Sequence, residues 1–282
     1  MPPFTLASGG NVAVMASMTD VSQSNAIALD YRGSQFAQAV SQGNPNQVAT
    51  GEGFFDRFFA VLAQPGTAED GFFGANADLL LVSDPDGTDM NTGVMNYGSP
   101  TVLSGNWGVL FDVRFVNRVI PPALPGTIGV RPGLRYGEFI EWTTTTAAAE
   151  AAPITPPVSA PTAITLGGYG FYAGGTGIGT TPTLAWSPGG IGNAPAFYKV
   201  TVSELFADAQ NRTAARTIAR ILTPNTWLTF PPDILVSGRS YVILLTAVTS
   251  TSPEGAALLA VSPFKTGLDI AVAQTVSGVF VP

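Results

Sequence analysis

The sequence predicts an all-β protein, and three observations point to that class. Apolar residues alternate with polar ones along much of the chain, which is the pattern of strands with one buried face. The 32 glycines and 23 prolines are spread along the chain instead of being gathered in repeats, so short strands are expected to alternate with turns. Only residues 33–40 and 206–222 favour helix, the second through its alanine and arginine content.

The alternating segments define the expected strands in chain order. In the first half, apolar side chains fall on one face at Ile27, Leu29 and Tyr31, and again at alternate positions of residues 107–115. The same alternation is found in residues 12–14, 58–62, 139–145, 198–202 and 241–248. Turn-forming clusters separate these segments. We therefore expect short strands that each bury one face.

Composition excludes several classes of function. Only 11% of the 282 residues are charged, against about 25% in an average globular domain. The chain has no histidine and no cysteine, which excludes Ser-His-Asp and Cys-His catalytic sites, histidine or thiolate metal ligands, and disulfides. A net charge of −7 with only two lysines opposes nucleic acid binding. The longest aliphatic runs are far shorter than the ~18 residues of a transmembrane segment, and none is expected.

A change of composition near the middle predicts a domain boundary. Residues 151–161 hold four prolines among small residues, which is typical of a semi-rigid linker. We expect an acidic, β-sandwich-like N-terminal domain over residues 1–150 and a second domain over residues 162–282. Charge agrees with this division, because residues 1–153 carry six arginines against 14 acidic residues, whereas residues 154–282 carry six basic and five acidic residues.

The second half contains the most specific motif. Trp186 lies in an early alternating segment, and Leu235 and Gly238 precede Tyr241, which begins another. This spacing resembles the fibronectin type III sandwich, an immunoglobulin-like fold, with Ser237 where that family often has proline. The resemblance covers about residues 158–270. It implies a structural core in which Trp186 is buried and Tyr241 hydrogen-bonds back to the chain beyond Leu235 and Gly238.

A second resemblance concerns the cellular setting. Residues 177–186 and 230–241 are similar to the C-terminal module of certain secreted or lipid-anchored surface proteins of myxobacteria, and residues 87–108 are similar to part of the β-domain that precedes that module. The resemblance implies a bacterial protein at the outer cell surface or in the extracellular space, and it brings no activity. We expect a signal peptide or lipid anchor to have been removed ahead of the sequence.

Asp84, Asp86, Asp89 and Asn91 are candidate calcium ligands. Calcium takes six to eight oxygen ligands, and this acidic segment supplies several close together. The spacing departs from that of an EF-hand, because Gly87 comes too early and the twelfth position is methionine. The alternative, which we prefer, is a tight turn formed by the Pro and Gly of this segment. No other cofactor is expected.

Three aromatic residues are candidate binding residues. Tyr169, Phe171 and Tyr172 lie among glycines, which leave room for their rings to stack on a sugar or contact a protein partner. The alternative is that they form the first strand of the second sandwich. Glu138 and Glu141 are three apart on an expected strand and point to opposite faces, so they are interpreted as polar edge residues and not as a catalytic pair.

These observations favour a non-enzymatic extracellular or cell-surface β-protein that acts in adhesion or in binding a protein or glycan partner. The alternative is a structural subunit of a repeating extracellular assembly, such as a filament, fibre or surface layer, because few charges suit self-association. A hydrolase that uses paired carboxylates is a remote third hypothesis, since it needs neither histidine nor cysteine.

Overall fold

The computed structural model describes residues 25–44, 56–62, 80–83, 88–97, 110–250, 252 and 270–282. Strands far outnumber helices in it, which confirms the all-β class. The first half contains β1 (Asn25–Arg32), α1 (Gly33–Gly43), β2 (Asp56–Leu62), β3 (Leu80–Ser83), β4 (Asp89–Tyr97), β5 (Leu110–Val119), β6 (Tyr136–Thr145) and α2 (Thr146–Glu150). The second half contains β7 (Thr162–Leu166), β8 (Tyr169–Gly170), β9 (Gly175–Thr176), β10 (Thr183–Ser187), β11 (Phe197–Ala207), β12 (Thr213–Thr223), β13 (Trp227–Thr229), β14 (Ser240–Ser250), β15 (Ile270–Val276) and β16 (Phe280–Val281).

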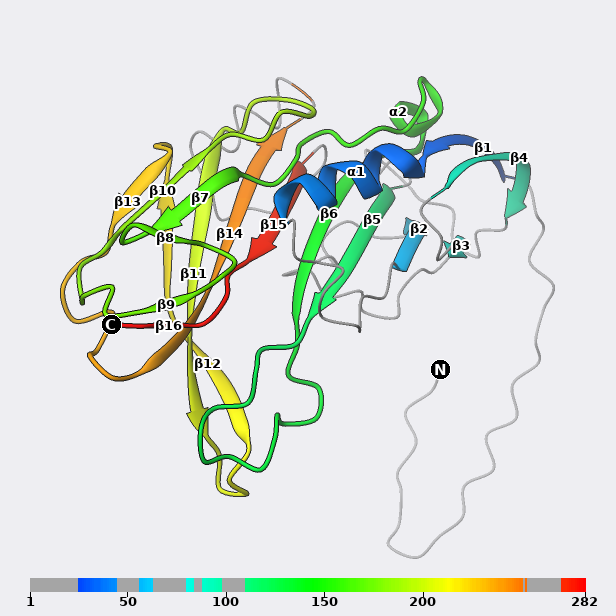
Figure 1. Cartoon of the computed structure of the whole chain (residues 1–282). Coiled ribbons are helices and arrows are strands. Elements are labelled where there is room, and N and C mark those ends of the chain that lie inside the picture. The colour runs from blue at the N-terminus through cyan, green and yellow to red at the C-terminus, as the bar shows by residue number, and fades with distance from the viewer. Residues whose placement is uncertain are drawn as a thin grey trace, which may run out of the picture.

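One long sheet runs through both halves of the chain (Figure 1). Its main path is β12-β11-β14-β15-β6-β5-β2-β3, and all of these neighbours are antiparallel. The halves meet where β15 pairs with β6, from Ile270 opposite Thr143 to Gln274 opposite Phe139. A strand from the second half therefore continues the sheet of the first.

A four-stranded sheet, β13-β10-β7-β8, faces β11 and β14 (Figure 1). Leu184 of β10 and Val200 of β11 are fully buried in the same hydrophobic cluster. Between the sheets the ring of Trp186 meets that of Tyr198 edge to face, with centroids 5.0 Å apart. The inward-facing side chains of both sheets therefore form one core, as the alternation of residues 198–202 and 241–248 predicts.

The helix predicted at residues 33–40 is confirmed as α1, which lies across β5 and β6 (Figure 1). Phe36, Ala39 and Val40 are buried, and this i, i+3, i+4 spacing places them on one face of the helix. The ring of Phe36 stacks on that of Tyr31 in β1 at 5.0 Å. β1 pairs with β4 in a separate two-stranded sheet.

The helix tendency of residues 206–222 is not realised, and that expectation is wrong. β12 pairs with β11 along its whole length, from Thr213 opposite Ala207 to Thr223 opposite Tyr198. The carboxylate of Asp208 accepts the N–H groups of Gln210 and Arg212 in the connecting turn. The pairing with β11 outweighs the weak helix propensity of alanine and arginine, which is only tenths of a kcal/mol per residue.

Residues 151–161, expected to be a semi-rigid linker, are built into the fold. The N–H of Ile154 donates to the carbonyl of Asp30 at 2.7 Å, and the N–H of Arg32 donates to the carbonyl of Ile154 at 3.0 Å. Ile154 and Val158 are buried in a core cluster that contains residues from both halves. The segment is therefore not a free spacer, while the division into two domains stays a prediction. In the described parts of the chain, no helix has both the length and the apolar character to cross a membrane.

Candidate functional site

A cavity of about 250 Å³ lies where β15 and β6 separate. The ladder between them stops at Gln274 opposite Phe139, although β6 continues to Tyr136. Beyond that point β15 turns away: the N–H of Ser277 donates to the carbonyl of Ile243, and the N–H of Gly278 donates to the carbonyl of Phe171, both at 2.9 Å. Because one strand leaves while the other continues, a gap opens between them.

The side chain of Glu138 stands where the next backbone partner of β15 would be. Its Oε1 accepts hydrogen bonds from the N–H of Val276 at 3.1 Å, from Thr275 Oγ1 at 3.0 Å and from Asn44 Nδ2 at 2.8 Å. The residue is only 1% exposed. A buried carboxylate needs such donors to offset the loss of hydration. Since Asn44 directly follows α1, this carboxylate also fixes the end of the helix to β6.

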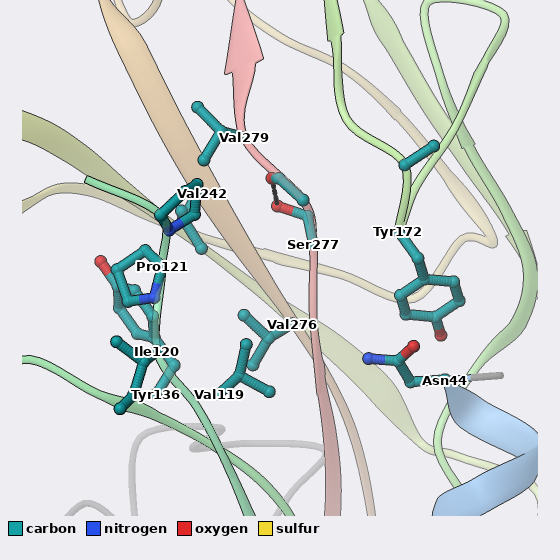
Figure 2. A pocket seen from close by; sticks show the side chains of 13 residues that line it. Asn44, Val119, Ile120, Pro121, Tyr136, Tyr172, Val242, Val276, Ser277 and Val279 are labelled. Carbon is teal, nitrogen blue, oxygen red and sulfur yellow. Dashed lines mark hydrogen bonds between the residues drawn. The ribbon is translucent and has the colours of Figure 1, made fainter. Parts of the chain in front are cut away.

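The cavity has apolar walls and a polar end (Figure 2). The walls are aliphatic side chains from the end of β5, the connection after it, β14, and the β15–β16 region: Val119, Ile120, Pro121, Val242, Val276 and Val279. The polar end is formed by Asn44 and Tyr172, whose amide and hydroxyl groups lie on the same side of the cavity (Figure 2). Segments far apart in the sequence therefore build one site.

The two tyrosines that line the cavity carry neutral phenols at neutral pH. Burial raises the pKa of Tyr136 above its usual value of 10.0, and the side chain of Ser203 partly offsets this rise. Burial raises the pKa of Tyr172 more strongly; a hydrogen bond with Thr275 lowers it, and the charge of Glu138 raises it again. Both phenols are therefore hydrogen-bonding groups at neutral pH and not proton acceptors.

The hydroxyl groups of Thr275 and Tyr172 are hydrogen-bonded to each other at the polar end. Thr275 Oγ1 lies 3.1 Å from the hydroxyl of Tyr172 and 3.0 Å from Glu138 Oε1. A threonine hydroxyl has a single hydrogen. Thr275 Oγ1 is placed as the donor to both Glu138 Oε1 and the hydroxyl of Tyr172, so its one hydrogen serves one of these two acceptors at a time. The carboxylate of Glu138 and the phenol of Tyr172 therefore compete for the hydrogen of Thr275.

Ser277 is the serine of the cavity lining, and its hydroxyl has a structural role. Its Oγ donates to the carbonyl of Gly278 at 2.6 Å and accepts the N–H of Ile243 at 2.8 Å. Both partners are backbone groups, which cannot take its proton, whereas a serine nucleophile needs a base beside it. Ser277 therefore holds the turn of the strand away from β6.

The structure separates the three aromatic residues predicted to bind a partner. Phe171 is only 1% exposed and belongs to the core, so a stacking surface shared by all three rings is ruled out. Tyr169 is 41% exposed, and its ring lies so close to Gly175 that a Cβ there would be 2.7 Å from it. Tyr172 alone reaches the cavity. The glycine-rich setting thus points to one residue of the site and not to a surface.

Two of the four candidate calcium ligands, Asp84 and Asp86, lie outside the described residues. Asp89 Oδ1 accepts the Oγ hydroxyl of Ser34 at 2.6 Å and its N–H at 3.1 Å at the start of α1. These bonds from Ser34 lower the pKa of Asp89, and Arg32 contributes in the same direction. Asn91 Oδ1 accepts the N–H of Gly93. Among the residues that the structure describes, no three acidic side chains are grouped to hold a metal ion, and calcium binding stays a prediction.

The four residues predicted to form the structural core lie as follows. Trp186, Leu235 and Tyr241 are buried. The N–H of Val236 donates to the hydroxyl of Tyr241 at 2.9 Å. Gly238, between them, has φ +78°, a conformation that favours glycine. The phenol of Tyr241 therefore ties down the turn that precedes its own strand.

Sequence reasoning missed Glu138 and Asn44 as parts of the site. Glu138 and Glu141 are both buried on β6, which has β5 and β15 as neighbours, so their interpretation as edge residues is wrong. The available signal was that Glu138 shares one face of β6 with the apolar Ile140. An acidic side chain on a buried face needs a hydrogen-bonding partner inside the protein. Asn44 is 94 residues away from Glu138 in the sequence, and no local pattern connects them. No protein-family model and no curated protein matches the chain.

Proposed function

We propose that this is a non-enzymatic binding protein of the extracellular space or outer cell surface, and that the cavity between β15 and β6 holds its ligand. The observation that carries the proposal is the combination of aliphatic walls with a small polar end formed by Asn44 and Tyr172. A mostly apolar cavity with a few placed polar groups is the usual form of a small-molecule site.

The chemistry of the lining favours binding over catalysis. The described lining residues include no carboxylate, lysine or arginine, and the whole chain has no histidine or cysteine. The raised pKa values of Tyr136 and Tyr172 keep both phenols protonated, and the hydroxyl of Ser277 is engaged by backbone groups. General base catalysis needs a group that accepts a proton near the working pH. The cavity is suited to holding a ligand unchanged.

The surface location is the second part of the proposal. We assign residues 162–282 to a fibronectin type III-like sandwich, a form shared by many cell-surface domains. Three features support it: β7, β10 and β13 face β11 and β14, Trp186 lies against Tyr198 between them, and the phenol of Tyr241 accepts the N–H of Val236. The step from this fold to a surface protein is an analogy with that family.

The outer strand of the long sheet favours a binding role over a subunit of a filament or surface layer. β12 carries Arg216 and Arg220, and its register with β11 shifts so that Ile218 has no opposite residue. Val130 bridges to Thr213 at the start of this strand. Charged side chains, a bulge and a covering loop are the means by which proteins prevent pairing between exposed sheet edges.

The test is a screen for small ligands combined with obstruction of the cavity. We expect ligand-detected NMR with the full chain to find small organic compounds that bind. Ala173→Leu, an exposed position on the cavity lining, is expected to abolish their binding, whereas Ala152→Leu, an exposed position outside the lining, is expected to leave it unchanged. A screen without hits, or hits that bind equally to Ala173→Leu, would show that the cavity is not a ligand site.

A further inference from the structure

We propose that the outer face of the four-stranded sheet β13-β10-β7-β8 binds an uncharged glycan of flat sugar rings, such as a β-1,4-linked glucan, and that one ring stacks on the indole of Trp227. This face is separate from the cavity, because no residue of these four strands belongs to the cavity lining. The inference therefore goes beyond the proposed function and does not depend on it.

Strand register places Trp227 on the outer face. β13 is the outermost strand of the four-stranded sheet (Figure 1). Leu184 and Trp186 of β10 are buried in the core between the sheets, so Ala185 points to the opposite side. Ala185 is paired with Trp227 of β13 and with Thr165 of β7. Directly paired residues face the same side, so these three form a line across the outer face.

The indole of Trp227 is left open to solvent. Of the three tryptophans whose side chains the structure describes, Trp227 alone is exposed, at 55%, although tryptophan is mostly buried on average. The face of an indole carries partial negative charge, which attracts the C–H groups that β-linked glucose presents on both faces of its ring. Beside it Ala185 has a short side chain, which leaves room for the sugar ring.

Two threonine hydroxyls lie next to the indole on the same face. Thr229 follows Trp227 by two residues along β13, which is about 7 Å, and it is paired with Thr183. The two Oγ1 atoms are 2.9 Å apart at an exposed position. Each hydroxyl carries one hydrogen, and the bond between them uses only one of the two. Whichever hydroxyl donates, the pair keeps one hydrogen and free lone pairs for the hydroxyl groups of a sugar.

The charge and the size of the face favour a glycan over a protein partner or a second copy of the chain. β7, β8, β10 and β13 contain no charged residue, which suits an uncharged ligand. Four strands span about 14 Å across and the five residues of β7 or β10 about 17 Å along, so the face measures about 240 Å². A stable protein–protein interface buries about 800 Å² on each partner. The face is therefore too small for such an interface, and a short oligosaccharide is matched to it.

Two oligosaccharides of one shape test the inference. We expect cellopentaose, an uncharged β-1,4-glucan, to bind the full chain at pH 7 and to shift the fluorescence of Trp227 to shorter wavelengths, because the sugar removes water from the indole. The β-1,4-linked pentamer of glucuronic acid has the same backbone with one carboxylate on each ring. It should bind at least about fivefold more weakly, since it meets a net charge of −7 and no cation in these strands. Isothermal titration gives both affinities.

Three variants locate the site. Trp227→Ala should lower the affinity for cellopentaose at least about tenfold. Ala185→Gln keeps the indole but places a longer side chain beside it, and should lower the affinity to a similar extent. Tyr169→Ala is the control, because this exposed aromatic residue is paired with the buried Leu166 and so lies on the other face of the sheet; it should leave the affinity unchanged. Thermal unfolding of all three variants shows whether the fold is retained.

The outcomes separate this inference from the proposed function. If cellopentaose does not bind, if the glucuronic acid pentamer binds as tightly, or if folded Trp227→Ala and Ala185→Gln bind cellopentaose as well as Tyr169→Ala does, the inference is wrong. If light scattering shows a dimer that Trp227→Ala converts to a monomer, a second copy covers the face and the inference is again wrong. None of these results affects the proposed function, because ligands of the cavity should bind Trp227→Ala as they bind the unchanged protein.

Discussion

Replacing Glu138 with alanine is expected to lower the free energy of unfolding by about 3–6 kcal/mol. The carboxylate accepts hydrogen bonds from Asn44, Thr275 and Val276, and all three residues are buried. A buried donor left without an acceptor costs about 1–3 kcal/mol, so three such donors cost about 3–9 kcal/mol. The adjacent cavity lets water reach some of them, which places the expected value in the lower part of that range. This is a large share of the roughly 5–15 kcal/mol that stabilises a typical domain.

Urea denaturation followed by far-ultraviolet circular dichroism measures this change. Glu150→Ala is the matched control, because Glu150 Oε1 accepts the N–H of Ala28 at an exposed position, and its loss is expected to cost less than about 1 kcal/mol. Glu138→Gln keeps the shape and one carbonyl acceptor, so the loss in its free energy of unfolding should lie between the losses for Glu138→Ala and Glu150→Ala. If Glu138→Ala destabilises no more than Glu150→Ala, the carboxylate does not hold the end of β15, and our account of the cavity fails.

The remaining predictions concern the close approach of Gly278 to residues 172–174, alkaline pH, the turn at Tyr241 and calcium. Gly278→Ala should lower the free energy of unfolding by about 1–3 kcal/mol, since its Cβ would lie 2.6 Å from Gly174 N and Tyr172 O. Gly190→Ala is the control: a Cβ at that position has no neighbour within 4 Å, so the free energy of unfolding should change little in the same urea assay. The folded state raises the pKa of Tyr172, so the stability that this phenol contributes is complete below about pH 10 and is lost as pH rises further. The thermal midpoint of Tyr172→Phe should therefore fall less steeply above about pH 10 than that of the unchanged protein. Parallel plots of the two midpoints against pH would contradict this. Tyr241→Phe removes the acceptor of the Val236 N–H and should cost about 0.5–1.5 kcal/mol, with no change in the urea midpoint speaking against a structural role of that phenol. Calcium should leave the thermal midpoint unchanged, because the turn interpretation of the acidic segment is preferred, and a clear increase would instead establish a metal site.

The elements that sequence reasoning predicted correctly are those defined by local spacing. The period of two at Ile27, Leu29 and Tyr31 corresponds to the buried face of β1, and the helix tendency of residues 33–40 corresponds to α1, which buries Phe36, Ala39 and Val40 on one face. Each pattern depends only on which face of the element meets the core. β12 was misread because its conformation is decided by pairing with β11, which contributes more than the propensities of its own residues.

The site was less predictable than the fold for the same physical reason. Thr275 and Glu138 are 137 residues apart in sequence, and their hydrogen bond exists only because β15 leaves its ladder with β6 at that level. No spacing rule describes the point at which two paired strands diverge. Tyr172 was selected from the sequence for its glycine-rich setting, although in the structure its phenol is buried enough to raise its pKa. Phe171, next to it, could not be assigned to the core in this way, since residues 171–173 form a turn in which the strand alternation does not hold.

The position of β15 has a consequence for how the protein is made. This strand lies between β14 and β6 in the long sheet, yet it follows both of them in the chain. While the chain is being synthesised, β6 and β14 therefore have open edges until residues 270–276 leave the ribosome, and pairing over such sequence distances is slow. Unpaired strand edges are the surfaces through which folding intermediates associate wrongly. A chain cut short before residue 270 would thus keep both edges open and would be a substrate for chaperones and proteases.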